Sequence, residues 1–137
     1  MEIQDLILAD YAAANEGGKF TLVGAGFSKI SARQFPCIHP VMFILVRAKI
    51  TLRDKGKNRI EMTIIGERGK IFGAGCDVNV PETQIEEEYA VLPIQLVNLK
   101  FDLPGPYNVE VFVNGELKAS HPLTIVDCRP SGPDLER

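Results

Sequence analysis

Cys37 and His39 are the two side chains whose types and spacing come nearest to nucleophilic chemistry in this sequence. A thiolate with an imidazole as its base is the arrangement used by cysteine hydrolases. Two positions of equal parity in a strand put both side chains on one face, so the pair is feasible. The third group that would orient the imidazole is missing from this stretch. We therefore predict no catalytic residue. A hydrolase or thiol enzyme, with Cys37 or His39 beside a carboxylate in a cleft, is the third functional hypothesis.

His39 and His121 are the only histidines, and each precedes a proline. A metal site of the cupin type requires several histidines and a glutamate at short strand spacing, and the sequence has no such cluster. His121 lies on the apolar parity of its segment, near Tyr107 or Val109 in the expected hairpin. We predict that no metal ion is bound and that His121 is a partly buried packing residue.

Acidic residues gather in one stretch that offers oxygen ligands. Calcium requires about six to eight oxygens from converging loops, and only one acidic loop is evident. We predict a solvated acidic edge here, with a cation site as the alternative. The residues concerned are Asp77, Glu82, Glu86, Glu87 and Glu88.

Basic residues recur at every second position of a polar stretch further upstream. This spacing predicts a charged hairpin tip that keeps a sheet edge soluble. Contact with an anion or an acidic partner is the alternative. The residues are Arg53, Lys55, Lys57 and Arg59.

Two glycine motifs bear on cofactor binding. Gly24-Ala25-Gly26 begins like a dinucleotide fingerprint, but Lys29 stands at the third glycine position and no helical pattern follows. That fingerprint requires a strand, a turn and a helix, so that the phosphate meets the helix N-terminus. Gly69-Lys70 lacks the remaining residues of a P-loop. We predict no cofactor, and we expect these glycines in strands or bulges.

The composition limits the classes of partner. The chain has 137 residues, a net charge of −3 and no tryptophan. Nucleic-acid surfaces are basic and clustered, and single-stranded nucleic acids stack on aromatic side chains. Membrane helices require roughly 20 consecutive apolar residues, and no run approaches that length. We predict a protein partner or self-association, with a homodimer among the options, and neither nucleic acid nor membrane as a partner.

Three scattered cysteines indicate the compartment. Cys37, Cys76 and Cys128 form no close pair with one another or with a histidine. An odd number of separated cysteines is typical of reduced thiols rather than of a disulfide framework. We therefore expect a cytoplasmic protein in which Cys76 and Cys128 act as small apolar side chains.

The elements that must position these residues have the pattern of β-strands. Residues alternate in character on both sides of Asn114-Gly115, which is a strong hairpin signal. A two-residue turn there would put Val111 opposite Lys118, so we predict a three-residue loop with Gly115 in a left-handed bulge. Other strands are predicted within 3–13, 20–30, 41–52, 60–65, 70–80 and 89–101, and 31–40 as an extended crossing between sheets.

These strands predict the fold class. Gly73 and Gly75 indicate a bulge or an edge in 70–80, and Pro93 indicates an edge strand. A helix over 2–14 is the competing interpretation of the first segment. We predict an all-β domain, an antiparallel two-sheet β-sandwich of about eight strands, immunoglobulin-like or of jelly-roll type. The domain spans 1–128, and 129–137 is a loose C-terminal tail.

Two resemblances support this interpretation. Gly105-Pro106-Tyr107-Asn108-Val109 resembles the tyrosine corner of immunoglobulin-like sandwiches, which implies that the Tyr107 hydroxyl bonds to upstream backbone. Leu103 stands where that motif usually has an aspartate. A longer series resembles a family of uncharacterised bacterial proteins, a domain of unknown function. The series is LADY at 8–11, GK at 18–19, GAG at 24–26, QFPCIHP at 34–40, NLKFDLPGPY at 98–107, then VNGEL and HPL.

The family resemblance implies an all-β fold and a bacterial origin, and it supplies no activity, ligand or catalytic residue to transfer. With no catalytic constellation in view, our first hypothesis is a non-enzymatic interaction or binding module that acts through a surface or an edge strand. The second is a small-ligand or carbohydrate-binding protein that uses loops at one end of the sandwich. The hydrolase is the third.

Overall fold

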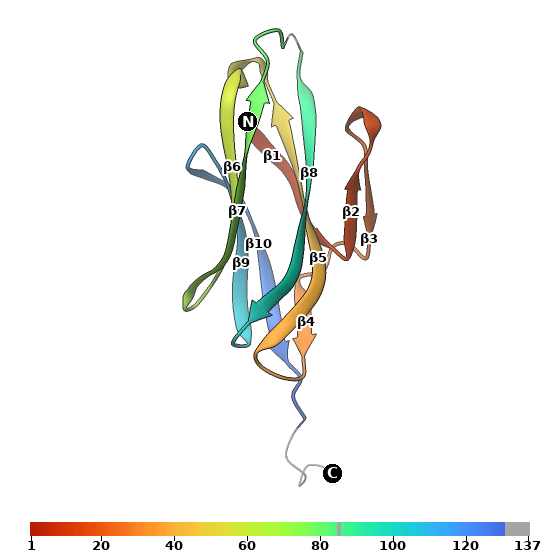
Figure 1. Ribbon diagram of the computed structural model, residues 1–137, viewed down its shortest axis with the longest axis vertical. Helices are drawn as coiled ribbons and strands as arrows, with labels where there is room; N and C mark the ends of the chain where they lie inside the picture. Colours follow the sequence, from red (N-terminus) through yellow and green to blue (C-terminus); the bar gives the residue numbers. More distant parts are fainter. Residues whose placement is uncertain (85, 131–137) are drawn as a thin grey trace.

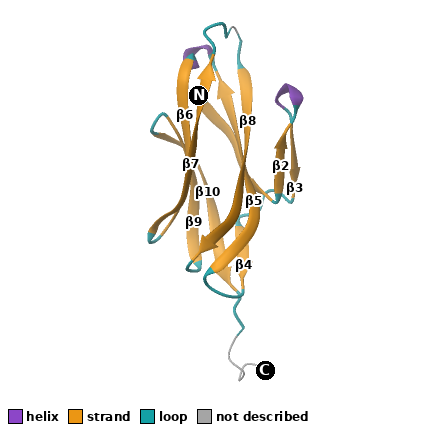
Figure 2. Cartoon of the chain, viewed as in Figure 1, coloured by secondary structure: helices purple, strands orange, loops and turns teal. Residues whose placement is uncertain are grey.

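The computed structural model describes residues 1–84 and 86–130, and nearly all of them lie in strands or the turns between strands (Figure 2). The prediction of an all-β fold is confirmed. The described residues form ten strands rather than about eight, since segments 3–13 and 20–30 each divide into two. Two short 3-10 turns, η1 (Glu16–Gly18) and η2 (Leu52–Asp54), complete the elements. Most of the predicted tail, 131–137, lies outside the described residues.

The strands form three sheets. The three-stranded sheet has the order β1 (Glu2–Ala9), β5 (Cys37–Ile50), β8 (Glu88–Phe101). The five-stranded sheet has the order β4 (Lys29–Ala32), β10 (Glu116–Asp127), β9 (Gly105–Val113), β6 (Gly56–Gly66), β7 (Gly69–Val80). A separate hairpin pairs β2 (Tyr11–Ala14) with β3 (Phe20–Val23). All pairings are antiparallel except that of β4 with β10. The segment from β4 to β5 crosses between the larger sheets, as predicted for 31–40.

One apolar core lies between the two larger sheets, which extend side by side along the long axis of the molecule (Figure 1). The alternation in β6 and β9 places every second residue in this core, which follows from the period of two in a strand. The buried core residues are Leu8, Ile30, Ala32, Met42, Ile44, Val46, Ile60, Met62, Ile64, Leu96, Leu99, Phe101, Tyr107, Val109, Val111, Val113, Leu123 and Ile125.

The β2–β3 hairpin covers the outer face of the three-stranded sheet. It stands beside β5 and β8 in Figure 1, and Leu45 on the outer parity of β5 is fully buried as a result. Tyr11 of β2 packs edge-on against Phe43, with ring centroids 5.2 Å apart. This explains why the first half of the 41–52 segment is apolar on both parities. Both faces of that strand are covered.

Near one end of β5 and β8, the alternation of inward and outward side chains shifts by one residue in both strands. His39 pairs with Leu99 on the core side, and Met42 pairs with Leu96 on the same side, although three positions separate the two pairs. Strict alternation cannot bury both pairs. Asn98 in β8 absorbs the change with a left-handed φ of 54°, a conformation that asparagine tolerates better than most residues. His39 consequently points inward.

The prediction for the β9–β10 turn was wrong. Val113 pairs with Glu116, so the connection is a two-residue turn in which Asn114 and Gly115 have φ of 52° and 83°. Gly115 is left-handed, but within the turn and not within a bulge of a three-residue loop. The burial argument failed because the register of β10 is corrected further along the strand, between Leu117 and Ala119.

A bulge at Lys118, rather than a longer loop, places the apolar residues of β10 opposite those of β9. Leu117 pairs with Phe112 and Ala119 pairs with Val111, which leaves Lys118 as the extra residue. The slip restores the apolar parity of β10 against the core. His121 then pairs with Val109, as predicted, and is partly buried.

Tyr107 forms the predicted tyrosine corner. Its hydroxyl donates a hydrogen bond to the backbone carbonyl of Leu103, with an oxygen–oxygen distance of 2.7 Å. Its ring packs edge-on against Phe101 at 5.1 Å and lies over Gly66, where an added Cβ would come within 2.6 Å of the ring. The corner therefore joins the end of β6 to the crossing from β8 to β9.

We expect Tyr107→Phe to lower the free energy of unfolding by about 1 kcal/mol, because the Leu103 carbonyl loses its partner in a partly buried setting. Urea denaturation measures this change. Tyr11→Phe is the matched control, since Tyr11 is 48% exposed. Equal effects of the two substitutions would show that the Tyr107 hydroxyl has no structural role.

Candidate functional site

β7 provides a long free edge of the five-stranded sheet. β7 is the last strand of the five-stranded sheet and pairs only with β6 among the residues that the structure describes. It is 12 residues long, and residues 73–77 are all exposed. A long exposed edge presents backbone donors and acceptors to any other extended chain. The prediction that Gly73 and Gly75 mark a bulge or an edge is confirmed.

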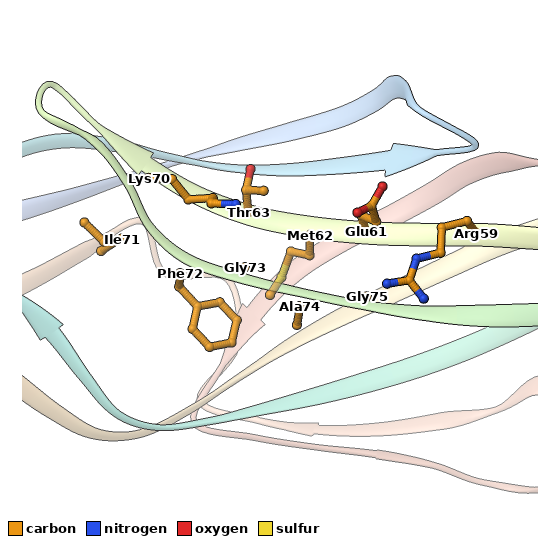
Figure 3. Close-up of a pocket in the computed structure, with 10 residues that line it drawn as sticks. All are labelled: Arg59, Glu61, Met62, Thr63, Lys70, Ile71, Phe72, Gly73, Ala74 and Gly75. Carbon is orange, nitrogen blue, oxygen red and sulfur yellow. The ribbon is translucent and has the colours of Figure 1, made fainter.

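The outer face beside this edge is a shallow groove with a glycine floor (Figure 3). Gly73 and Gly75 pair with Thr63 and Glu61 of β6, so the outer side of β7 carries no side chain at these positions. Long basic side chains occupy the space instead. A Cβ on Gly75 would lie 2.7 Å from the Arg59 guanidinium, and one on Gly73 would lie 3.4 Å from Lys70 Nζ. The groove has a volume of about 550 Å³.

The charges of this face are loosely held. Asp77 lies 3.5 Å from Arg59 and 3.6 Å from Lys57, and all three side chains are well exposed. Exposed ion pairs of this length contribute little to stability, because water screens them and both side chains lose rotamer freedom. The Asp77 carboxylate is therefore able to exchange these partners for another cation.

A second groove, nearly all apolar, opens between β7 and β8. Its volume is about 310 Å³. Ile60 and Met62, only 3% and 1% exposed, belong to the core, so the core reaches the surface in this groove. The lining residues are Ile60, Met62, Ala74, Gly75, Cys76, Leu92, Pro93 and Ile94.

The apolar groove exists because the two sheets differ in width. β1 lies beside β10 at one side of the core. At the other side β8 is the edge of the three-stranded sheet, and it pairs with β5 alone among the described residues. Pro93 in the middle of β8 cannot donate to a ladder, which agrees with its predicted place in an edge strand. Two edge strands, β7 and β8, therefore flank one apolar groove that has buried core residues at its base.

The structure places Cys37 and His39 on one face of β5, as their spacing predicted, since both pair with core residues of β8. It does not bring them together in one hollow. His39 lines a hollow of about 340 Å³ with Asp10, Gly24, Phe27, Lys29 and Ile30. Cys37 packs against the core instead. The hydrolase hypothesis required Cys37 or His39 beside a carboxylate in a cleft. His39 and Asp10 do line one hollow, but the Cys37 thiol does not line it.

The model of a family of unknown function, DUF6941, matches residues 4–126. The chain belongs to this family. The predicted membership of an all-β family without an assigned function is confirmed. No curated protein matches the DUF6941 chain.

One solved structure that resembles the DUF6941 chain is an alkylpurine DNA glycosylase, AlkC, from Pseudomonas fluorescens, bound to DNA containing an abasic site analog. The two are 16% identical with a TM-score of 0.38, and the match covers 72% of this chain and 28% of the glycosylase. A TM-score this low carries no argument about function.

The prediction that excluded nucleic acid as a partner was wrong. The solved structure that resembles this chain is a protein bound to DNA, although so weak a match does not show that this chain binds DNA. The exclusion rested on the net charge of the whole chain and on the absence of tryptophan. A net charge is a sum and leaves local groupings undescribed. Arg59 and Lys70, for example, line one groove beside the β7 edge, together with Glu61. Separately, no helix among the described residues is long and apolar enough to cross a membrane.

The charged stretches of the DUF6941 chain differ in part from the predictions. Arg53 and Lys55 lie in or next to the turn at η2, but Lys57 and Arg59 belong to β6 because the strand begins at Gly56. Asp77 pairs with these strand residues, and Glu87 pairs with Lys49. Among residues 1–84 and 86–130, no group of three or more His, Cys, Asp or Glu is arranged to hold a metal ion. Residue 85 of the acidic loop lies outside the described residues.

The remaining motifs have local explanations. Gly24 and Gly26 lie in the loop between β3 and β4 with φ of 59° and 89°, and a strand rather than a helix follows. Cys76 and Cys128, which were predicted to act as small apolar side chains, are both exposed. Cys76 lines the apolar groove. The groove itself was not foreseen. Its one sequence signal is the run of small residues from Gly73 to Cys76 on a strand expected to lie at an edge.

His39 is a partly buried titratable group with a lowered pKa. Its Nε2 atom is buried and has no hydrogen-bond partner among the described residues. Burial lowers the pKa of His39 from its ordinary value of 6.5, and the nearby Asp10 carboxylate offsets only part of this effect. The unfolded chain therefore binds a proton at this position more tightly than the folded chain does.

We expect the free energy of unfolding to fall as the pH falls below 6.5, because the stability linked to neutral His39 is present above that value and lost toward the lower folded pKa. Chemical denaturation in buffers from about pH 7.5 to about pH 5.5 measures the slope. His39→Gln should flatten it. His121→Gln, which retains His39, should keep it, and a slope unchanged in His39→Gln would contradict the assignment.

Proposed function

We propose that the DUF6941 chain is a non-enzymatic interaction module that binds an extended polypeptide segment along the free edge of β7. The observation that carries this proposal is the juxtaposition of an open backbone edge with an apolar groove. An edge alone supplies main-chain hydrogen bonds, and a groove alone supplies apolar contact. Strand addition uses both, with affinity from the backbone and specificity from alternate side chains.

The two faces of β7 specify the segment. A strand placed beside residues 73–77 would send every second side chain into the apolar groove toward Met62, Leu92 and Ile94. The intervening side chains would lie on the outer face near Arg59, Glu61 and Lys70. The bound segment therefore has apolar residues at alternate positions and polar residues between them. Gly73 and Gly75 leave room for large side chains on the outer face.

The fold and setting belong to the same proposal. An immunoglobulin-like sandwich is supported over a jelly roll by the tyrosine corner at Tyr107. A single domain over 1–128 remains a prediction. A cytoplasmic location is proposed from the odd number of widely spaced cysteines.

A small-ligand binder is the second candidate, and the hollow at His39 favours it. Asp10, Lys29 and His39 line about 340 Å³ there, and the buried Nε2 atom lacks a hydrogen-bond partner among the described residues. The charged and polar lining favours a small ligand with charged or hydrogen-bonding groups over a neutral sugar. We rank this candidate second because the hollow at His39 does not combine a long free strand edge with an apolar groove, as the β7 edge does.

Selection of displayed peptides from a random library on the purified protein tests the first candidate. We expect enriched peptides with apolar residues at alternate positions. Ala74→Asp should weaken the binding of a selected peptide about tenfold or more, because the carboxylate would be desolvated in the apolar groove. Fluorescence anisotropy gives the dissociation constant.

Ala25→Asp is the matched control, since Ala25 is also exposed and lies in the β3–β4 loop. It should leave the affinity unchanged, and thermal unfolding should show that both variants are folded. Enriched peptides without alternation, or equal losses in the two variants, would refute binding at the β7 edge.

A further inference from the structure

We propose that the segment bound at this edge is β7 of a second copy, so that two chains pair antiparallel about Ala74 and their five-stranded sheets become continuous. The inference rests on the proposed function, because it uses the same edge, and it names the partner. The inference is based on the order of residues along β7. When two copies of β7 run antiparallel, the Lys70 of one copy faces the partner's Asp77, and glycines and small apolar residues face each other between them.

The register follows from which face each β7 residue occupies. Gly73, Gly75 and Asp77 pair with Thr63, Glu61 and Arg59 on the outer face of β6. Phe72 pairs with Ile64 and Lys70 with Ile65, so Ile71 is an extra residue on β7. This bulge returns the Lys70 side chain to the outer face, where Asp77 also lies. Without it, Lys70 and Asp77 would occupy opposite faces.

Antiparallel pairing about Ala74 then matches residues of like face. Ala74 lies opposite the partner's Ala74, Gly73 opposite the partner's Gly75, and Phe72 opposite the partner's Cys76. Past the bulge, Lys70 lies opposite the partner's Asp77. Two-fold symmetry repeats this contact, so the interface contains two cross-strand ion pairs.

Other registers lose this match. A slip of two residues places Lys70 opposite the partner's Asn79 or the partner's Gly75, and both ion pairs disappear. A slip of one residue sets the outer face of one copy against the inner face of the other. Charge complementarity thus selects the pairing about Ala74. Lys70 is in no ion pair among the described residues, and Asp77 is held only by the two long contacts described above.

The side chains at the centre suit close approach of two strands. On the outer face the facing residues are glycines, which leave the Arg59 and Lys70 side chains undisturbed. On the inner face the smallest apolar residue, Ala74, meets itself on the symmetry axis. The two apolar grooves adjoin across the axis, so pairing removes from water the apolar surface of Ala74 and Cys76, which is exposed in the single chain.

Cross-linking tests the register. In a chain with Cys37→Ala, Cys76→Ser and Cys128→Ser, the added Ala74→Cys should form an intermolecular disulfide under mild oxidation, because facing Cβ atoms in an antiparallel pair lie about 4.5–5.5 Å apart. Ala25→Cys in the same background is the control and should remain monomeric on a non-reducing gel. Cross-linking that is equal at both positions, or absent at position 74, would overturn the register.

Charge exchange tests the ion pairs. Lys70→Asp and Asp77→Lys should each weaken the dimer about tenfold or more in sedimentation equilibrium, because each brings like charges together twice. The double variant Lys70→Asp/Asp77→Lys should recover the dissociation constant to within about threefold of the natural sequence. A double variant as weak as the single ones, with all variants folded by circular dichroism, would rule out this pairing.

The two proposals fail in different ways. A chain that stays monomeric up to about 1 mM, yet binds alternating apolar peptides in an Ala74-dependent manner, overturns the dimer and leaves the proposed function intact. Loss of both dimer and peptide binding removes both.

Discussion

Closure of one apolar core between two sheets of unequal width is the constraint on which the remaining features depend. The three-stranded sheet covers the core up to β8, whereas the five-stranded sheet continues to β7. Contact between β1 and β10 closes one side. The other side stays open because no strand lies between β7 and β8 in the described residues. Ile60 and Met62 lie at the base of the apolar groove that this opening leaves.

Several local irregularities keep apolar side chains facing that core. At Asn98 the inward and outward sides of β5 and β8 shift by one residue. The extra residues Lys118 and Ile71 do the same for the side chains of β10 and β7. Each inserts or rotates a single residue where strict alternation would expose an apolar side chain. The same device at Ile71 places Lys70 and Asp77 on one face, which gives the β7 edge its self-complementary charges.

Much of the fold was predictable from local pattern, and its failures have a common cause. The alternation around Asn114-Gly115 predicted the hairpin, and the motif at Tyr107 predicted a bond to upstream backbone, since both depend on neighbours in sequence. The length of the turn was predicted wrongly because the correcting bulge lies four residues away at Lys118, where no residue type marks it. The site was missed for a related reason. The β7–β8 groove joins segments that sequence pattern treats separately.

By itself the sequence determined an all-β chain, its edge strands at Gly73-Gly75 and Pro93, and a family without an assigned activity. These properties follow from side-chain period, backbone freedom and the missing proline donor, all of which act within a few residues. Tertiary structure alone decided which strands share a sheet, where His39 lies relative to Asp10, and where the core remains uncovered. The reason is that burial on a strand is set by what lies across the core and beside the edge, and those neighbours come from distant parts of the chain.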